Sequence, residues 1–202
     1  MRTLRWILTA TVAIAAGACN DTRSVPSAPD NDPTLLVTES EPGTRLYQFR
    51  TVEDPEVSGA NVFCTAASAG FTPNVFLNAS VYAEHVRASD AMVVAERTDP
   101  IGTALACAQI TDFSFPPGKQ QNFYALFKLP SGDFSAKGTC TLISNNVPEA
   151  RLILAGCTLS VVEAPEGVVG GAATSLSVFN PFRLPGYSTG SRWTLQVYES
   201  GS

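Results

Sequence analysis

The sequence predicts an all-β fold: an antiparallel β-sandwich, or a barrel-like domain, of about 8–10 strands stapled by disulfides. Two observations favour this class. Apolar and polar residues alternate in short runs, and Pro, Gly and Asn separate these runs every 10–15 residues or so. The 202 residues are 45% hydrophobic and 15% charged. This composition excludes a disordered, collagen-like or coiled-coil chain and allows one domain.

The first 18 residues have the pattern of a signal peptide. Arg2 and Arg5 precede an apolar run of 13 residues, from Trp6 to Ala18. Such a run is too short to span a bilayer, which takes roughly 20 residues. It ends in Ala-Gly-Ala, the small-residue pattern that signal peptidases accept, directly before Cys19.

Small residues before a cysteine, after a charged start and a short apolar run, resemble the lipobox of bacterial lipoproteins. The resemblance covers only about the first twenty residues. It implies that Cys19 becomes the first residue of the mature protein and carries lipid, with acyl chains such as palmitate. Asn20 after this cysteine resembles the outer-membrane default of Gram-negative lipoproteins. We therefore expect a lipid-anchored protein of the cell envelope, at the outer membrane.

An ordinary secretory signal, leaving Cys19 as a free thiol, is the alternative. Cysteine counting favours lipidation. The chain has five cysteines, and an unpaired thiol is awkward in an exported protein. Assigning Cys19 to lipid leaves four cysteines that can pair completely.

Residues 19–33 predict a disordered tether that is rich in Pro and Asp and poor in apolar side chains. Loss of two arginines with the leader leaves 11 basic and 18 acidic residues, a net charge of −7. An acidic body is repelled by an anionic leaflet. The scattered basic residues also argue against a nucleic-acid partner.

Residues 34–202 form the single predicted β-domain. Four runs alternate clearly, and turns are predicted at residues 116–118, 130–133, 145–148, 163–167 and 184–186. Only residues 91–97 could instead form a short helix. The inward-facing sets of the four runs are Tyr47, Phe49, Thr51; Val75, Leu77, Ala79, Val81; Phe123, Ala125, Phe127, Leu129; and Trp193, Leu195, Val197.

The remaining cysteines predict two disulfides. Cys140 and Cys157 lie in similar Cys-Thr-Leu runs on adjacent predicted strands, which leaves Cys64 to pair with Cys107. A zinc site would favour close pairs of cysteines, and the spacings here are 43, 33 and 17. An exported protein favours disulfides. We expect no metal and no cofactor.

Catalytic signals are weak. His85 is the only histidine. Residues 186–190 read Gly-Tyr-Ser-Thr-Gly and match the nucleophile elbow G-x-S-x-G around Ser188, but a strand-like run follows and His85 lies far upstream. The acidic cluster Glu53, Asp54 and Glu56 reads as a solvated loop, with glycoside hydrolysis or calcium binding as alternatives.

Two predicted loops carry candidate binding residues. Phe113 and Phe115 lie in one, and Phe182, Arg183 and Tyr187 lie in the other. Such rings can stack on sugars or anchor a protein partner, with Arg supplying hydrogen bonds. The alternative is that they close the ends of the core.

The sequence as a whole predicts an envelope lipoprotein with a non-catalytic binding or interaction module. Its partners would be the membrane, through the lipid, and an envelope protein or glycan. Two alternatives remain: a hydrolase acting on envelope or extracellular carbohydrate or ester, and a structural component of a surface assembly.

The substitution Cys19→Ser tests the anchor. If Cys19 carries lipid, the variant moves from the membrane fraction to the soluble exported fraction and loses label from a fatty-acid analogue. A wild-type protein that takes up no label would contradict lipidation.

Overall fold

The computed structural model describes residues 37–201 except 42, 88–91, 96–98 and 148–150. The expected signal peptide, the tether and Cys19 lie outside these residues. Within them no helix is long and apolar enough to cross a membrane.

The described residues form an all-β structure, as the sequence predicts. Two four-residue helices, α1 (Ala60–Phe63) and α2 (Ala66–Ala69), lie between the second and third strands. Ten strands are described: β1 (Val37–Glu41), β2 (Thr44–Glu53), β3 (Val75–Arg87), β4 (Met92–Ala95), β5 (Gly102–Gln109), β6 (Gln120–Leu129), β7 (Gly132–Val147), β8 (Leu152–Glu163), β9 (Val168–Phe179) and β10 (Gly190–Glu199).

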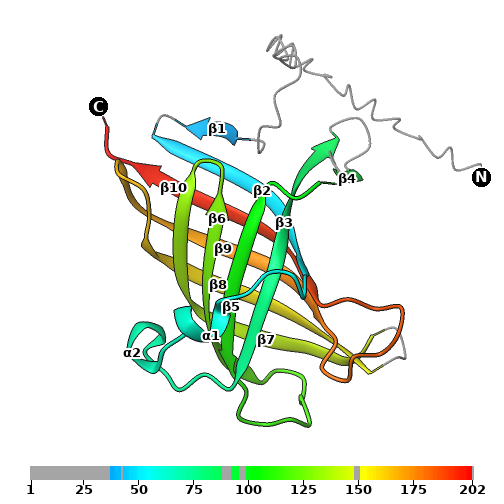
Figure 1. Cartoon of the computed structure of the whole chain (residues 1–202). Coiled ribbons are helices and arrows are strands. Elements are labelled where there is room, and N and C mark those ends of the chain that lie inside the picture. Colours follow the sequence, from blue (N-terminus) through cyan, green and yellow to red (C-terminus); the bar gives the residue numbers. More distant parts are fainter. Residues whose placement is uncertain (1–36, 42, 88–91, 96–98, 148–150, 202) are drawn as a thin grey trace, which may run out of the picture. The chain divides into compact units, whose positions relative to one another are not determined.

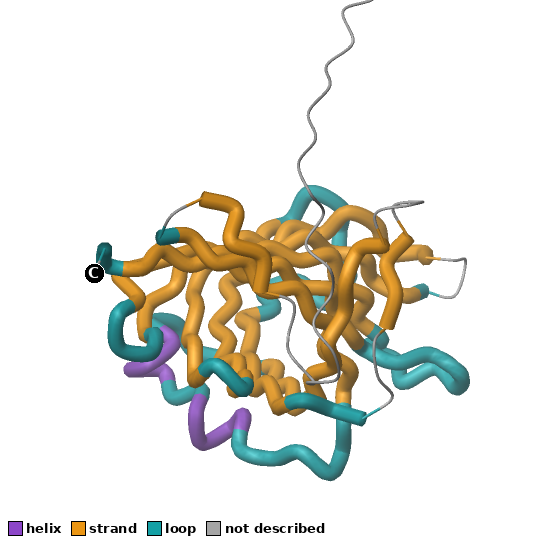
Figure 2. Tube along the Cα trace, turned by 90° about the horizontal axis from the view of Figure 1, so that it is seen from above, coloured by secondary structure: helices purple, strands orange, loops and turns teal. Residues whose placement is uncertain are grey.

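Eight antiparallel strands close into a barrel (Figure 1). Their order is β2-β10-β9-β8-β7-β6-β5-β3, and β3 pairs with β2 to complete the circle. The sequence left sandwich and barrel open, and the structure selects the barrel. The strands form a ring with the helices outside it (Figure 2).

The two short strands cover the edges where β2 and β3 diverge. Residues 44–47 of β2 pair with β1, and residues 49–53 pair with β3. Residues 84–87 of β3 pair with β4 instead of β2. The helix considered for residues 91–97 is wrong where the structure describes it, because residues 92–95 form β4. Covered edges leave fewer unpaired backbone groups for association with other chains.

The predicted inward-facing residues form the barrel core. Aromatic rings run through it as a connected series: Phe49 packs on Phe127, Phe127 on Trp193, and Trp193 on Phe123, at centroid distances of 5.2, 4.9 and 6.2 Å. Trp193 also donates from Nε1 to Thr51 Oγ1 at 3.2 Å. These positions confirm the alternation that the sequence showed in β2, β6 and β10.

Both disulfides form as predicted. Cys140 of β7 and Cys157 of β8 occupy directly opposite positions in the ladder. Strand β7 continues to Val147, so the turn expected at residues 145–148 is wrong for residues 145–147, and residue 148 lies outside the described residues. Cys64, which ends α1, bonds to Cys107 of β5.

The second disulfide anchors the helical segment to the outside of the barrel. Beside it Phe63 stacks on Tyr124 of β6 at 4.6 Å, and Cys64, Cys107 and Tyr124 are buried together with Ala69. Burial raises the pKa of Tyr124, against a lowering hydrogen bond from Ser135. This outer cluster covers β5 and β6 close to one end of the barrel.

Close strand contacts require glycine at several positions. At Gly171 of β9 an added Cβ would lie 2.3 Å from the Gln196 carbonyl oxygen and 3.0 Å from Val197 Cα of β10. Its neighbour Gly170 has nothing within 4 Å of the same added atom. The neighbouring strand therefore packs directly against the Gly171 backbone, as glycine in a curved sheet permits.

The adjacent glycines give a matched test of this packing. We expect Gly171→Ala to lower the free energy of unfolding by about 1–3 kcal/mol, because the methyl group collides with backbone. Gly170→Ala should change it by less than about 0.5 kcal/mol. Urea denaturation measures both. Equal stability of the two variants would contradict the close approach of β9 and β10.

Candidate functional site

One end of the barrel carries the long connections. Residues 54–74, 110–119 and 180–189 join β2 to β3, β5 to β6 and β9 to β10 at this end (Figure 1). We name it the long-loop end. At the opposite end, residues 130–131 and 164–167 separate β6 from β7 and β8 from β9, and residues 88–101, which include β4, join β3 to β5. Ligand sites lie preferentially on loops that a rigid scaffold holds in place, so the long-loop end is the first place to search.

The candidate aromatic residues divide between surface and core. Phe113, Phe182 and Tyr187 expose 62, 52 and 45% of their surface. Phe115 is buried and packs edge-on against Phe179 of β9 at 6.0 Å, with a left-handed φ of 51°. Phe115 therefore closes the end of the core, the alternative that the sequence left open for these rings.

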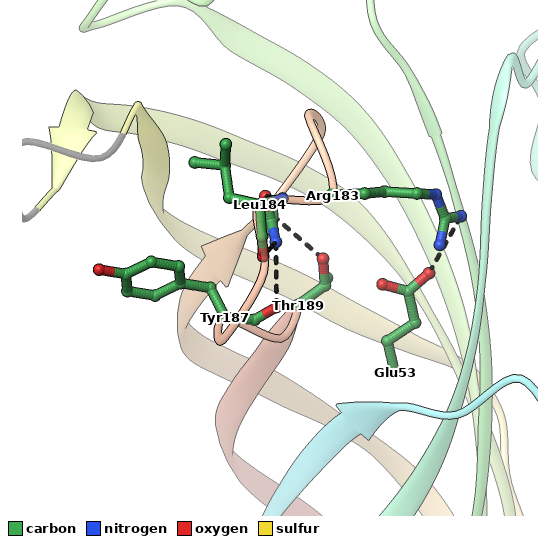
Figure 3. Close-up of polar contacts among 6 residues, drawn as sticks. Glu53, Arg183, Leu184, Tyr187 and Thr189 are labelled. Atoms are coloured by element: carbon green, nitrogen blue, oxygen red, sulfur yellow. Dashed lines mark hydrogen bonds and ion pairs between the residues drawn. The ribbon is translucent and has the colours of Figure 1, made fainter.

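Buried Asn180 organises the loop that bears Arg183 and Tyr187 (Figure 3). Its Oδ1 accepts from the Leu184 N–H at 2.9 Å, and its Nδ2 donates to the carbonyl oxygens of Leu184 and Tyr187, both at 3.0 Å. Its own N–H donates to Thr189 Oγ1 at 3.1 Å. One side chain thus satisfies the backbone across the turn and fixes the directions of the exposed residues.

Arg183 and Tyr187 extend from the loop in different directions (Figure 3). Arg183 reaches back to Glu53, the last residue of β2, with 3.5 Å between Nη2 and Oε1. The backbone is joined at the same place, where the Glu53 N–H donates to the Thr189 carbonyl oxygen at 2.8 Å. These two contacts fasten the loop to the start of the β2–β3 connection.

A polar cleft lies beside this ion pair. Its volume is about 330 Å³, and Phe76, which is 43% exposed at the start of β3, forms one of its walls. Such a volume falls in the range of roughly 300–1,000 Å³ that is common for small-molecule sites. The other lining residues are Glu53, Asp54, Pro55, Val57, Asn78, Arg183, Tyr187 and Ser188.

Asp54 of this cleft is held as a carboxylate. The Ser80 hydroxyl donates to its Oδ2 at 2.5 Å, and the Glu56 N–H donates to its Oδ1 at 2.9 Å. Both hydrogen bonds favour the ionised form and keep the pKa of Asp54 below its ordinary value of 3.8. The acidic cluster seen in the sequence is therefore a structured turn that presents a negative charge.

The structure brings together some of the signals considered for catalysis: Ser188, Glu53 and Asp54 line the same cleft, whereas His85 lies away from it. Residues 186–190 lead directly into β10 rather than into a helix. Ser188 and His85 are well separated. Ser188 precedes Thr189, which bonds to Glu53, and Glu53 pairs with Ala79 of β3. His85 lies six residues after Ala79, roughly 20 Å further along the strand. Among the described residues no group of three His, Cys, Asp or Glu side chains could hold a metal ion.

One charged cluster was not anticipated from the sequence. Glu84 of β3 is 4% exposed, and its two oxygens lie 3.4 Å from Nε of Arg50 and 3.4 Å from Nε of Arg192. Burial raises the pKa of Glu84, while Arg192 and Arg50 act to lower it. Arg50 also covers the Tyr82 ring at 4.2 Å. The triad links β2, β3 and β10 on the outside of the barrel. The alternation of apolar and polar residues in the sequence does not reveal that these three strands are neighbours.

Comparison with known proteins gives no relative for this chain: no family model, no curated protein and no solved structure matches it.

The substitution Ser80→Ala should raise the pKa of Asp54 towards its ordinary value, because it removes the stronger of the two hydrogen bonds. A carboxyl-group NMR titration measures this. A lowered folded-state pKa stabilises the fold above the unfolded-state pKa, and this contribution is lost as the pH falls through the folded-state value. Ser80→Ala should therefore flatten the loss of stability below about pH 4.

Ser114→Ala is the matched control. Ser114 donates from both its N–H and its hydroxyl to Asp112 Oδ1 and lowers the pKa of that carboxyl. Removal of the Ser114 hydroxyl should raise the pKa of Asp112 and leave the pKa of Asp54 unchanged. An Asp54 pKa that is the same in wild type and Ser80→Ala would show that this hydroxyl does not hold the carboxylate.

Proposed function

We propose that this protein is a non-catalytic binding module of an envelope lipoprotein, and that its long-loop end binds a neutral glycan. The observation that carries the proposal is the polar cleft, in which an exposed aromatic ring stands beside a fixed array of charged and amide groups. Sugar rings present apolar C–H faces and a fringe of hydroxyls. A site for them needs both an aromatic surface and directional hydrogen bonds.

Phe76 supplies the aromatic surface, since it is partly exposed where the cleft opens. Hydrogen-bonding groups come from the Arg183–Glu53 pair and from Asp54. Two acidic residues against one basic residue leave the cleft negative, which disfavours acidic sugars and favours neutral ones. The fixed loop supports affinity, because little conformational freedom remains to be lost on binding.

Lipidation of Cys19 remains part of this proposal. A tether of residues 19–33, treated as a flexible coil, spans about 20 Å root-mean-square. It would let the domain sample glycans near the membrane without contact between the barrel and the lipid surface.

The other functions considered make different demands. A hydrolase would require Ser188, His85 or a pair of carboxylates to act on one substrate, and Ser188, in the loop before β10, lies far from His85 of β3. A protein partner or a surface assembly would use the exposed rings of Phe113 and Phe182 in preference to the cleft. The variants below separate glycan binding in the cleft from hydrolysis.

We expect Phe76→Ala to weaken binding of neutral oligosaccharides about two- to tenfold, the loss of one aromatic contact. Chemical-shift titration with a panel of neutral oligosaccharides measures the affinity. Tyr198→Ala is the matched control: Tyr198 is 44% exposed but lies in β10 at the opposite end of the barrel. It should bind as the wild type does.

Three results would contradict the proposal. Absence of any oligosaccharide binding by the wild type removes the ligand class. Equal loss in Phe76→Ala and Tyr198→Ala removes the cleft as the site. Cleavage of a glycan or ester that is abolished by Ser188→Ala or His85→Ala would make the protein a hydrolase.

A further inference from the structure

The barrel interior is not filled evenly along its axis. Towards the end opposite the long-loop end, it holds large aromatic rings, including Tyr47, Phe49, Phe127 and Phe134. Towards the long-loop end, beyond Phe123, small inward residues stand between large ones such as Leu142 and Ile153. Ala108, Ala155 and Ser177 line a cavity of about 70 Å³ there, together with the Cys140–Cys157 disulfide, and Phe115 closes it. The aromatic series of the core stops too early to fill this space.

Gln121 gives the cavity a chemical preference. It lies at the inward position of β6 before Phe123, is 3% exposed and lines the cavity. Its Oε1 accepts from the Thr111 N–H at 3.2 Å. Its Nε2 is the only buried side-chain nitrogen or oxygen without a hydrogen-bond partner in the described part of the chain. A buried donor without a partner destabilises the fold, so a group that accepts from it would bind favourably.

Water is a poor candidate for this acceptor. A buried water usually makes about three hydrogen bonds. The Ser177 hydroxyl already bonds to Ser175 at 2.9 Å, and Thr189 Oγ1 accepts from the Asn180 N–H, so each hydroxyl keeps only part of its hydrogen-bonding capacity for a water. The remaining lining near Gln121 is chiefly apolar, including Leu142 and Ile153. An apolar molecule with one acceptor oxygen would fill the space and, once a small rotation of the Gln121 amide turns Nε2 towards it, would satisfy the donor.

We propose that the barrel interior is a second binding site, separate from the glycan cleft, for a small apolar molecule with one carbonyl or ether oxygen, which accepts a hydrogen bond from Gln121 Nε2. An eight-stranded barrel has an interior just wide enough to be filled by side chains or to hold one small ligand. Here large side chains fill one half and leave room for a ligand in the other.

The volume limits the size of this ligand. An engineered cavity of about 150 Å³ binds benzene, which has six non-hydrogen atoms, so about 70 Å³ on its own suits a molecule of roughly three non-hydrogen atoms. A second interior cavity of about 40 Å³ continues past Phe123 and shares Leu77 and Ser191 with the first. Rotation of Phe123 would join the two and admit one small ring.

Two ring molecules of nearly equal shape test the proposal. Cyclopentanone has a carbonyl oxygen, and methylenecyclopentane has a CH₂ group in its place. Each is titrated into the wild-type protein while methyl signals of Leu77 and Ile153 and the side-chain amide signal of Gln121 are followed by NMR. We expect saturable shifts with both, and a Gln121 amide shift that cyclopentanone alone produces.

The variant Gln121→Met removes the donor and keeps an unbranched side chain of similar length. We expect the preference for cyclopentanone over methylenecyclopentane, taken as a ratio of dissociation constants, to fall about tenfold in this variant. Gln109→Met is the control, since Gln109 of β5 bonds to Asn122 near the surface. It should keep the wild-type ratio.

Absence of saturable shifts with either molecule would overturn the interior site. An unchanged ratio in Gln121→Met would overturn the role of Gln121. If this variant fails to fold, the wild-type comparison decides alone: a Gln121 amide signal that ignores cyclopentanone contradicts the proposal. The glycan cleft is tested by Phe76→Ala and different ligands, so either site can fail without the other.

Discussion

Residues 49–53 of β2 pair with residues 79–83 of β3, and this short contact joins the two ends of the strand order. Without it the same strands would form an open sheet with two long edges. Closure places Phe49 and Val81 inside a ring, where rings from β6 and β10 reach them. It also brings the start of β3 beside the end of β2, so that Asp54 meets Ser80 and Phe76 lines the same cleft as Glu53. The core and the candidate site both depend on this one pairing.

The contents of the barrel account for the two proposed sites. Aromatic packing fixes the half near the short turns, and each such pair contributes about 0.5–1.5 kcal/mol beyond its buried area. Stability supplied there allows the long-loop half to keep small side chains and an unpaired donor at Gln121. The outer cleft and the second interior cavity share Glu53 and Asn78 as walls. The ion pair of Glu53 and Arg183 therefore stands where the interior comes closest to the surface.

Much of the fold could be predicted from alternation and cysteine positions. The inward residues of β2, β3, β6 and β10 follow from a period of two, and the similar runs around Cys140 and Cys157 indicated neighbouring strands. Barrel closure could not be predicted, because the β2–β3 contact depends on curvature summed over all strands. The short helices were missed because four residues carry no usable periodicity.

The site was predicted only in part. The loops at 113–115 and 182–187, which the sequence singled out for their aromatic and basic residues, lie at the long-loop end, but a sequence does not say which rings turn inward, and Phe115 does. The Arg50–Glu84–Arg192 triad and Gln121 were missed for a related reason. The local sequence pattern does not distinguish these residues from other strand residues. Their contacts are with residues far away in the sequence.

The central claim is that closure leaves an apolar interior space at the long-loop end, and xenon tests it most directly. Diffraction from crystals held under xenon pressure should show a xenon peak inside the barrel between Phe115 and Phe123, because an apolar cavity binds such an atom without hydrogen bonds. Continuous protein density through that region, with no xenon peak inside the ring of strands, would contradict the account.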